Sequence, residues 1–285
     1  MTFLKTLPRI HIHPVLIVFM IIAFLTGTFM ELSIILFIVF VHELGHFFMA
    51  KKYRWRVRSV TLWVFGGVMD TDEHGSRRNQ EAFFVTIAGP LQHLWIYLML
   101  FFLFPFFQVP ASVAHTVFYY NTVILMFNLM PIWPLDGGKL LFNVLSAVLP
   151  FKKAYYRTLL ISMVSSFILI IMVLFVLPFN LSAFLVIAFL LYENKADWNK
   201  RFYVFIRFLL SRYEGNVVFT SLVPLTVNFD RSFMDVFSQF YREKNHPIYI
   251  IAPNGAKTMV DEQVCLDYYF RNRQNKKIGD VLLEH

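Results

Sequence analysis

Two histidines and a glutamate stand within five residues of one another, at His42, Glu43 and His46. Side chains four positions apart lie on one face of an α-helix, so both imidazoles can reach the same metal ion. Zinc hydrolases hold their metal with two histidines at this spacing and use the glutamate between them as a general base. The pattern therefore predicts a hydrolytic zinc site, with His42 and His46 as ligands and Glu43 as the base.

The setting of these residues strengthens the prediction. They lie in an otherwise apolar stretch, 32–50, which is long enough to cross a bilayer. An ionisable side chain at the centre of a membrane costs at least about 2.5–3.5 kcal/mol. A bound divalent cation compensates all three groups at once, and the alternative is a polar contact between helices.

A hydrolytic zinc ion needs a third protein ligand and an open position for water. Asp136 is the candidate, because it follows the fourth apolar stretch at a similar depth. His46 stands five residues before Lys51, and Asp136 stands three residues before Lys139, so both lie close to a basic membrane edge. The alternative for Asp136 is a helix cap or turn residue beside two glycines.

Prolines and glycines interrupt the helix around this aspartate, between Asn128 and Gly138. Non-helical backbone at membrane depth survives only where it is buried in protein or lines a wet cavity. We expect this segment to receive an extended peptide substrate, with Asn128 and Pro134 among the substrate-binding residues. The alternative for Asn128 is a cap or a bridge between helices.

The composition excludes most other classes of protein. Of the 285 residues, 58% are hydrophobic and 15% are charged, whereas soluble proteins average about 45–50% and about 25%. A single cysteine, Cys265, excludes an internal disulfide and a cysteine-rich zinc site. The net charge of +8 is assigned to membrane loops, so we expect no direct contact with nucleic acid.

Six apolar stretches are predicted to span the membrane. The first also resembles a signal peptide, but it runs almost directly into the second and is expected to stay as an anchor. Lys and Arg gather after the second, fourth and sixth stretches and are absent from the other three connections, which places both termini in the cytosol. The stretches are 14–30, 32–50, 83–104, 112–131, 157–177 and 179–193.

The remaining residues read as a small α+β region. We expect a membrane domain over 1–193, a basic amphipathic helix over 194–212 near the headgroups, and a cytosolic domain over 213–285. Strands are predicted at 217–227, 247–252 and 256–260, helices at 232–241 and 261–270, and a turn at 253–255. The predicted fold class is therefore a polytopic α-helical membrane protein of six transmembrane helices with a small C-terminal α+β domain.

Four segments together resemble the site-2 protease family of intramembrane zinc metalloproteases. They are His42–His46, Phe65–Gly67, Ala88–Pro90 and Asn128–Gly138. The resemblance extends over about residues 10–195 and implies a zinc metalloendopeptidase with Zn²⁺ on His42, His46 and Asp136. It also implies that Phe65, Gly66 and Gly67 form a membrane-associated edge strand, which can pair with substrate through backbone hydrogen bonds.

The sequence is most similar to the sporulation members of that family. This implies a membrane-associated substrate, the sigma-K type of sporulation sigma factor precursor, and inhibitory membrane proteins as partners. It also implies a location in the mother-cell membrane around the forespore. The C-terminal domain resembles a CBS-type module, which implies possible ATP binding and self-association. Thr258 and Asp261 do not match the usual nucleotide motif cleanly, so no nucleotide residues are assigned.

Other polar residues leave alternatives open. Gln92 and His93 in the third stretch are expected to form hydrogen bonds inside the bundle, or to face the catalytic cavity. His11 and His13 are expected to form hydrogen bonds at the membrane interface, with a metal site as the alternative. Asp70, Asp72, Glu73 and His74 are expected to be solvated charge, with a second metal site as the alternative. A metal-ion transporter and an inactive membrane scaffold are the competing functions.

Overall fold

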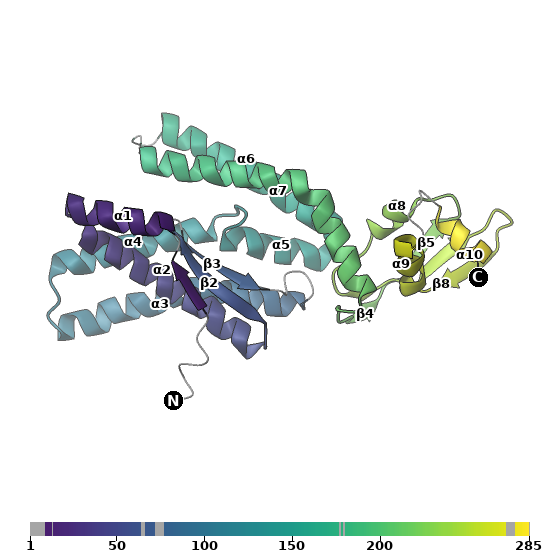
Figure 1. The fold of residues 1–285 in the computed structure, drawn as a ribbon, viewed down its shortest axis with the longest axis horizontal. Helices are drawn as coiled ribbons and strands as arrows, with labels where there is room; N and C mark the ends of the chain where they lie inside the picture. Colours follow the sequence, from purple (N-terminus) through teal and green to yellow (C-terminus); the bar gives the residue numbers. More distant parts are fainter. Residues whose placement is uncertain are drawn as a thin grey trace.

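Seven helices make up most of the chain and run side by side along the long axis of the molecule (Figure 1). The computed structural model describes residues 9–12, 14–63, 66–71, 77–176, 178, 180–271 and 277–284. The helices are α1 (Pro14–Thr26), α2 (Phe29–Lys52), α3 (Asn79–Phe106), α4 (Ala111–Leu129), α5 (Asp136–Val148), α6 (Phe151–Phe175) and α7 (Leu181–Tyr213).

Each of the six predicted apolar stretches overlaps one of these helices, although the first runs past the end of α1 and the last covers only the first part of α7. Three of them, α2, α3 and α6, are long and apolar enough to cross a membrane. Their outer faces expose large apolar side chains such as Phe101 and Phe175, which a bilayer would cover. The chain is therefore a helical membrane protein. Helix α5 was not predicted, because its short amphipathic sequence follows a run of prolines and glycines.

The most extensive contact between described helices is that of α2 with α3. A Cβ atom on Gly45 of α2 would lie 2.4 Å from the backbone oxygen of Ala88 on α3, so only glycine permits this approach. The result is that the turn of α2 carrying the two histidines is pressed against the turn of α3 that contains Gly89.

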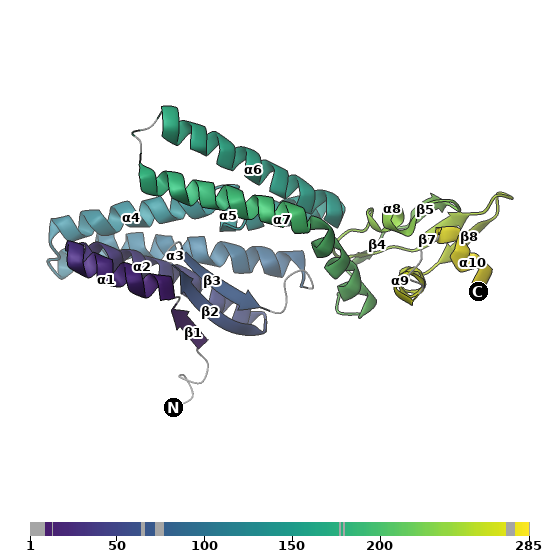
Figure 2. The same ribbon diagram turned by 45° about the horizontal axis from the view of Figure 1, so that its top comes forward.

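A small sheet packs beside α2, in the order β1 (Arg9–Ile12), β2 (Val57–Trp63) and β3 (Gly66–Thr71). Strand β1 is parallel to β2, and β2 and β3 form an antiparallel hairpin (Figure 2). Gly66 and Gly67 lie in β3, as expected of the edge strand. Phe65, His13, Asp72, Glu73 and His74 lie outside the described residues, and Asp70 lies in β3.

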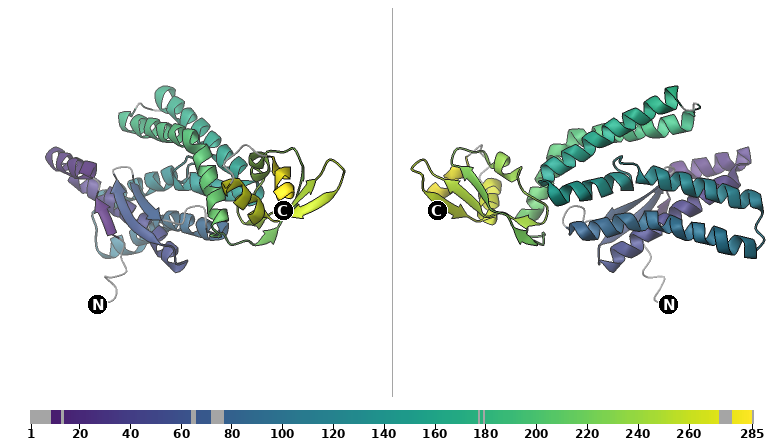
Figure 3. Two further views of the ribbon diagram at one scale, coloured as in Figure 1. Left: turned by 45° about the vertical axis from the view of Figure 1, so that its right-hand side comes forward. Right: turned by 180° about the vertical axis from the view of Figure 1, so that it is seen from behind.

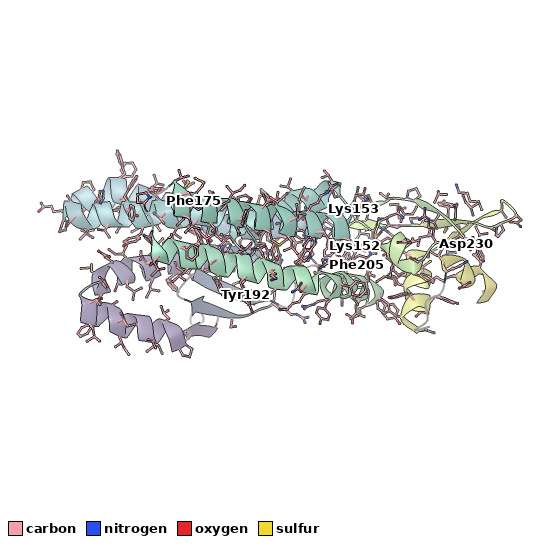
Figure 4. The ribbon with its side chains drawn as sticks, turned by 90° about the horizontal axis from the view of Figure 1, so that it is seen from above. Lys152, Lys153, Phe175, Tyr192, Phe205 and Asp230 are labelled. Carbon is pink, nitrogen blue, oxygen red and sulfur yellow. The ribbon has the colours of Figure 1, made fainter. Side chains whose placement is uncertain are left out.

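Helices α6 and α7 form a long hairpin that carries the C-terminal region at one end (Figure 3). The predicted connecting helix, 194–212, is the second half of the unbroken helix α7. Lys152, Lys153 and Phe205 lie at this end of the hairpin, whereas Phe175 lies at the other (Figure 4).

The C-terminal region is a small α+β unit, as predicted. Strands β5, β7 and β8 form its sheet, β4 pairs with β6, and Gly255 makes the predicted turn with a φ of +82°. The elements are β4 (Ser221–Leu222), β5 (Leu225–Asn228), α8 (Phe233–Phe237), β6 (Lys244–Asn245), β7 (Ile248–Ile251), β8 (Lys257–Val260), α9 (Glu262–Arg271), η2 (Ile278–Asp280) and α10 (Val281–Glu284).

The core of this unit includes the ends of two bundle helices. Phe151 of α6 and Phe205, Phe208 and Leu209 of α7 belong to the same buried cluster as Phe237 and the other core residues of the C-terminal region. The rings of Phe151 and Phe208 stack with centroids 4.0 Å apart. The C-terminal region is thus continuous with the α6–α7 hairpin.

Polar contacts join the same region to α3 and α5. The guanidinium of Arg242 donates hydrogen bonds to Asn79 at the start of α3, at 2.9 Å, and to Asn143 of α5, at 3.1 Å. The carboxylate of the neighbouring Glu243 accepts a hydrogen bond from the backbone N–H of Asn79. These contacts link the C-terminal region to the helix that begins at Asp136.

Candidate metal centre

Three ligand-type atoms converge where α2 meets the start of α5. The Nε2 atoms of His42 and His46 lie 3.0 Å apart, and each lies 3.0 Å from Oδ2 of Asp136. All three side chains are buried. The structure thus brings together the two predicted histidines and the predicted aspartate, which are 94 residues apart in sequence from His42 to Asp136.

This arrangement fits a zinc ion. Zinc binds imidazole nitrogen at about 2.0–2.1 Å and carboxylate oxygen at about 2.0–2.2 Å, and three atoms 3.0 Å apart can all lie within such distances of one ion. Nδ1 of His46 lies 2.8 Å from the backbone oxygen of Val85. A carbonyl only accepts hydrogen bonds, so Nδ1 carries the proton and Nε2 keeps its lone pair for a metal.

Gly89 leaves room for these ligand atoms. A Cβ atom built on Gly89 would lie 2.2 Å from Nε2 of His46 and 2.7 Å from Nε2 of His42. Any larger residue would occupy the space between α3 and the metal-binding atoms. The close approach of the imidazoles therefore requires glycine at this position of the Ala88–Pro90 segment.

Asp136 is the first residue of α5 and uses its two oxygens differently. Oδ2 faces the imidazoles, and Oδ1 lies 3.3 Å from Nζ of Lys139, one turn later in α5. From the sequence alone, Lys139 marks only the membrane edge. Its spacing of three residues from Asp136 was the signal that it can orient the carboxylate.

Trp133 fixes the loop that leads to Asp136. Its backbone N–H donates to Oγ of Ser162 at 2.7 Å, and its backbone oxygen accepts from Nδ2 of Asn194 at 2.6 Å. Its indole N–H donates to Oδ2 of Asp197 at 2.7 Å. Helices α6 and α7 therefore hold the loop in place, a role that the sequence analysis did not predict.

Glu43 is buried on α2, three residues before His46 and one after His42. Residues three apart share a helix face, so the carboxylate belongs to the same side of α2 as the His46 imidazole. This placement suits the predicted general base.

Among the described residues, the structure shows no contact between the predicted substrate residues and the centre. The side chain of Asn128 donates to the backbone oxygen of Ile124 in its own helix, and Pro134 is exposed in the loop before α5. Gly66 and Gly67 lie in β3, which packs beside α2. Their role in substrate binding stays a prediction.

His93 contacts the centre directly. Its Nε2 lies 3.0 Å from Nδ1 of His42, so the side chain both forms a hydrogen bond inside the bundle and faces the candidate metal ligands. Gln92 instead donates to the backbone oxygen of Ala88 in its own helix. Two polar residues in an apolar span indicated a buried polar contact, but the sequence does not reveal which of the two contacts His42.

Comparison with known proteins identifies the family. The sequence model of Peptidase family M50 matches residues 30–114 and 107–174. The chain belongs to peptidase family M50. The predicted resemblance to the site-2 proteases, which are zinc metalloproteases of this family, is confirmed, and the M50 chain is a membrane zinc metalloprotease of that type.

Named relatives of this M50 protein support the assignment. It is 40% identical over 280 residues to stage IV sporulation protein FB of Bacillus subtilis, covering 97% of each chain. It is 31% identical to zinc metalloprotease MJ0392 of Methanocaldococcus jannaschii, over 58% of this chain and 49% of that one. The solved site-2 protease from Methanocaldococcus jannaschii superimposes with a TM-score of 0.53 at 25% identity, covering 66% of this chain and 89% of that one.

Proposed function

We propose that this M50 protease cleaves a peptide bond in or next to the membrane, with His42, His46 and Asp136 as zinc ligands and Glu43 as the general base. The observation that carries the proposal is the convergence of the three ligand atoms, each 3.0 Å from the other two. A polar contact between helices that binds no metal would not require three ligand atoms to meet at one point.

The residues around the proposed zinc ion have separate roles in the reaction. When bound, Zn²⁺ supplies a Lewis acid that activates water and polarises the scissile carbonyl. Glu43 takes a proton from the attacking water and passes it to the leaving amine. Lys139 holds the second oxygen of Asp136, so that Oδ2 stays turned towards the imidazoles. Burial of the three ligands keeps competing water away from them.

We further propose that substrate pairs with β3. Strand β1 already lies along one edge of β2, and the other edge of β2 pairs with β3. Among the described strands β3 has β2 as its one neighbour, and it packs beside the helix that bears His42 and His46. An extended peptide added to β3 would use backbone hydrogen bonds, and Phe65, Gly66, Gly67, Asn128 and Pro134 are the residues proposed to bind it.

The proposed substrate is a membrane-associated sporulation sigma factor precursor of the sigma-K type, from which the enzyme removes the pro-sequence. The supporting observation is the 40% identity to a stage IV sporulation protein over nearly the whole chain. By resemblance to the sporulation members of the family, we also propose inhibitory membrane proteins as partners and the mother-cell membrane as location. Self-association through the C-terminal region is proposed by resemblance to CBS-type modules, which usually work in pairs. ATP binding there rests on resemblance to CBS-type modules alone.

We propose six spans with both termini in the cytosol. The basic Lys152 and Lys153 lie at the end of α6 that adjoins the C-terminal region, and the opposite end carries the exposed Phe175 (Figure 4). Basic residues favour the cytosolic side. In this arrangement the membrane domain comprises 1–193, and 194–212 connects it to the cytosolic domain over 213–285.

The test is cleavage of a candidate pro-sigma factor in vesicles or cells that contain the full chain. Glu43→Gln is expected to retain zinc and lose cleavage, and Asp136→Asn to weaken both. Glu31→Gln, an exposed glutamate on the same helix, is the matched control and should behave as wild type. Normal cleavage by Glu43→Gln would overturn the mechanism, and zinc flux without cleavage would favour a transporter.

A further inference from the structure

A chain of buried hydrogen bonds runs from the candidate metal centre into the bundle. It joins His42 of α2, His93 of α3 and Asn121 of α4. We propose that His93 and Asn121 are positioning residues that select the tautomer of His42 in which Nε2 can bind zinc. This inference rests on the proposed zinc site and adds two residues to it.

The first step is the orientation of the Asn121 amide. Nδ2 of Asn121 lies 3.2 Å from the backbone oxygen of His93, and Oδ1 lies 2.7 Å from Nδ1 of His93. A backbone oxygen only accepts, so the amide NH₂ group must face it. The amide oxygen therefore faces His93, and because an oxygen of this kind only accepts, Nδ1 of His93 carries the proton.

The second step follows from the chemistry of a neutral imidazole, which has one N–H donor and one acceptor nitrogen. Since Nδ1 of His93 is the donor, its Nε2 is the acceptor. Nε2 lies 3.0 Å from Nδ1 of His42, so Nδ1 of His42 must carry the proton of that hydrogen bond. Nε2 of His42 then keeps its lone pair, on the side that faces His46 and Asp136.

The two candidate histidine ligands thus reach the same tautomer by different means. His46 donates to a backbone oxygen, that of Val85, which no substitution removes. The tautomer of His42 instead depends on two side chains. His93 accepts its hydrogen bond, Asn121 orients His93, and both partners are fully buried. Partners of this kind orient metal-binding imidazoles and raise their basicity, and their loss typically lowers metal affinity about 10–100-fold.

This dependence can be tested by changing the partner's hydrogen-bonding ability. His93→Leu leaves Nδ1 of His42 without an acceptor and should weaken zinc binding about 10–100-fold. His93→Gln offers an amide oxygen and should recover much of the loss. Asn121→Leu should weaken zinc binding in the wild-type background but have little further effect in the His93→Gln background, because an amide has no tautomer to select.

The measurements are the zinc dissociation constant by chelator competition and the visible spectrum of the Co²⁺ form, on the full chain in detergent. Tyr97→Phe is the matched control, since it removes a 2.8 Å hydrogen bond to Thr122 between the same two helices. The inference is overturned if His93→Leu binds zinc like wild type, if His93→Gln is no better than His93→Leu, or if Tyr97→Phe loses as much affinity. Undiminished zinc binding by His42→Ala would instead refute the proposed zinc site itself.

Discussion

Nζ of Lys139 lies 3.3 Å from Oδ1 of Asp136, while Oδ2 of the same carboxylate lies 3.0 Å from Nε2 of both His42 and His46. The ammonium group and the imidazoles thus share one carboxylate without competing for the same oxygen. This division leaves Oδ2 as the oxygen available to a metal and fixes the rotation of the carboxylate about its bond.

Lys139→Met tests this role. The substitution keeps the length of the side chain and removes its charge, so Asp136 should rotate more freely and zinc affinity should fall. The Lys139 side chain is 41% exposed, so water screens the interaction and we expect a loss of no more than about 10-fold. Chelator competition measures it, with Lys153→Met on the adjacent helix as the control that should not change.

Gly89→Ala is expected to abolish zinc binding. The new methyl group would overlap Nε2 of His46, whose ring is held at its other end by the backbone oxygen of Val85. Either the ring or helix α3 must move, and both separate the three ligand atoms. Zinc content after purification gives the result. Leu91→Ala, a lipid-exposed position on α3, should retain full zinc, and retention of zinc by Gly89→Ala would contradict the geometry.

Trp133→Phe is expected to lower the rate of cleavage more than it lowers zinc content. It removes the hydrogen bond from the indole to Asp197 but keeps both backbone hydrogen bonds of the loop. A displacement of about 1 Å at a reaction centre can cost up to about 100-fold in rate. Trp198→Phe, on α7 but outside this loop contact, is the control. Equal rates for the two variants would show that the indole does not position the loop.

The sequence predicted the long apolar helices, though not the short α5, and the pairing of His42 with His46, because both depend on local regularities. Length and apolarity define a span, and a spacing of four defines a helix face. It could not predict that His93 meets His42, since that contact depends on the rotation of α2 against α3. Nor could it predict that α7 continues through its polar stretch at Glu193–Lys200, because such a stretch is also typical of a helix leaving the membrane.

A buried ion pair stabilises the C-terminal region. The guanidinium of Arg212, at the end of α7, contacts the carboxylate of Glu262 and donates to the backbone oxygens of Tyr241 and Lys244. Glu262→Gln leaves this cation buried without a countercharge, which typically costs about 3–5 kcal/mol. Asp230→Asn, which breaks an exposed pair with Lys277, should have little effect on stability.

The stability of the C-terminal region can be measured through the reactivity of Cys265. It is the single cysteine of the chain and is fully buried in this region, and burial raises its pKa to about 12. A thiol reagent therefore reaches it only when the region opens. In Glu262→Gln, labelling at neutral pH should be faster or should begin at lower urea than in wild type and in Asp230→Asn. Identical labelling in all three would show that the pair does not contribute to stability.

The buried cluster of Arg212, His246 and Glu262 predicts that the C-terminal region loses stability in acid. Burial raises the pKa of Glu262, but hydrogen bonds from His246 and Arg212 outweigh it and hold that pKa below its usual value. Burial also lowers the pKa of His246, although Glu262 opposes this. Unfolding lets both groups bind protons more readily, so stability falls below about pH 6.5 and again below about pH 4.3. Hydrogen exchange over residues 244–271, corrected for intrinsic rates, measures this, and unchanged protection down to pH 4 would contradict it.

The unbroken α7 has a structural consequence. Asn194 of α7 donates a hydrogen bond to the loop before Asp136. Further along the same helix, Phe205, Phe208 and Leu209 belong to the core of the C-terminal region. One helix therefore connects that core to the loop that leads to Asp136. Cutting the chain after α7 would expose Phe205, Phe208 and Leu209 to water, so the membrane part and the C-terminal region each depend on the other to stay folded.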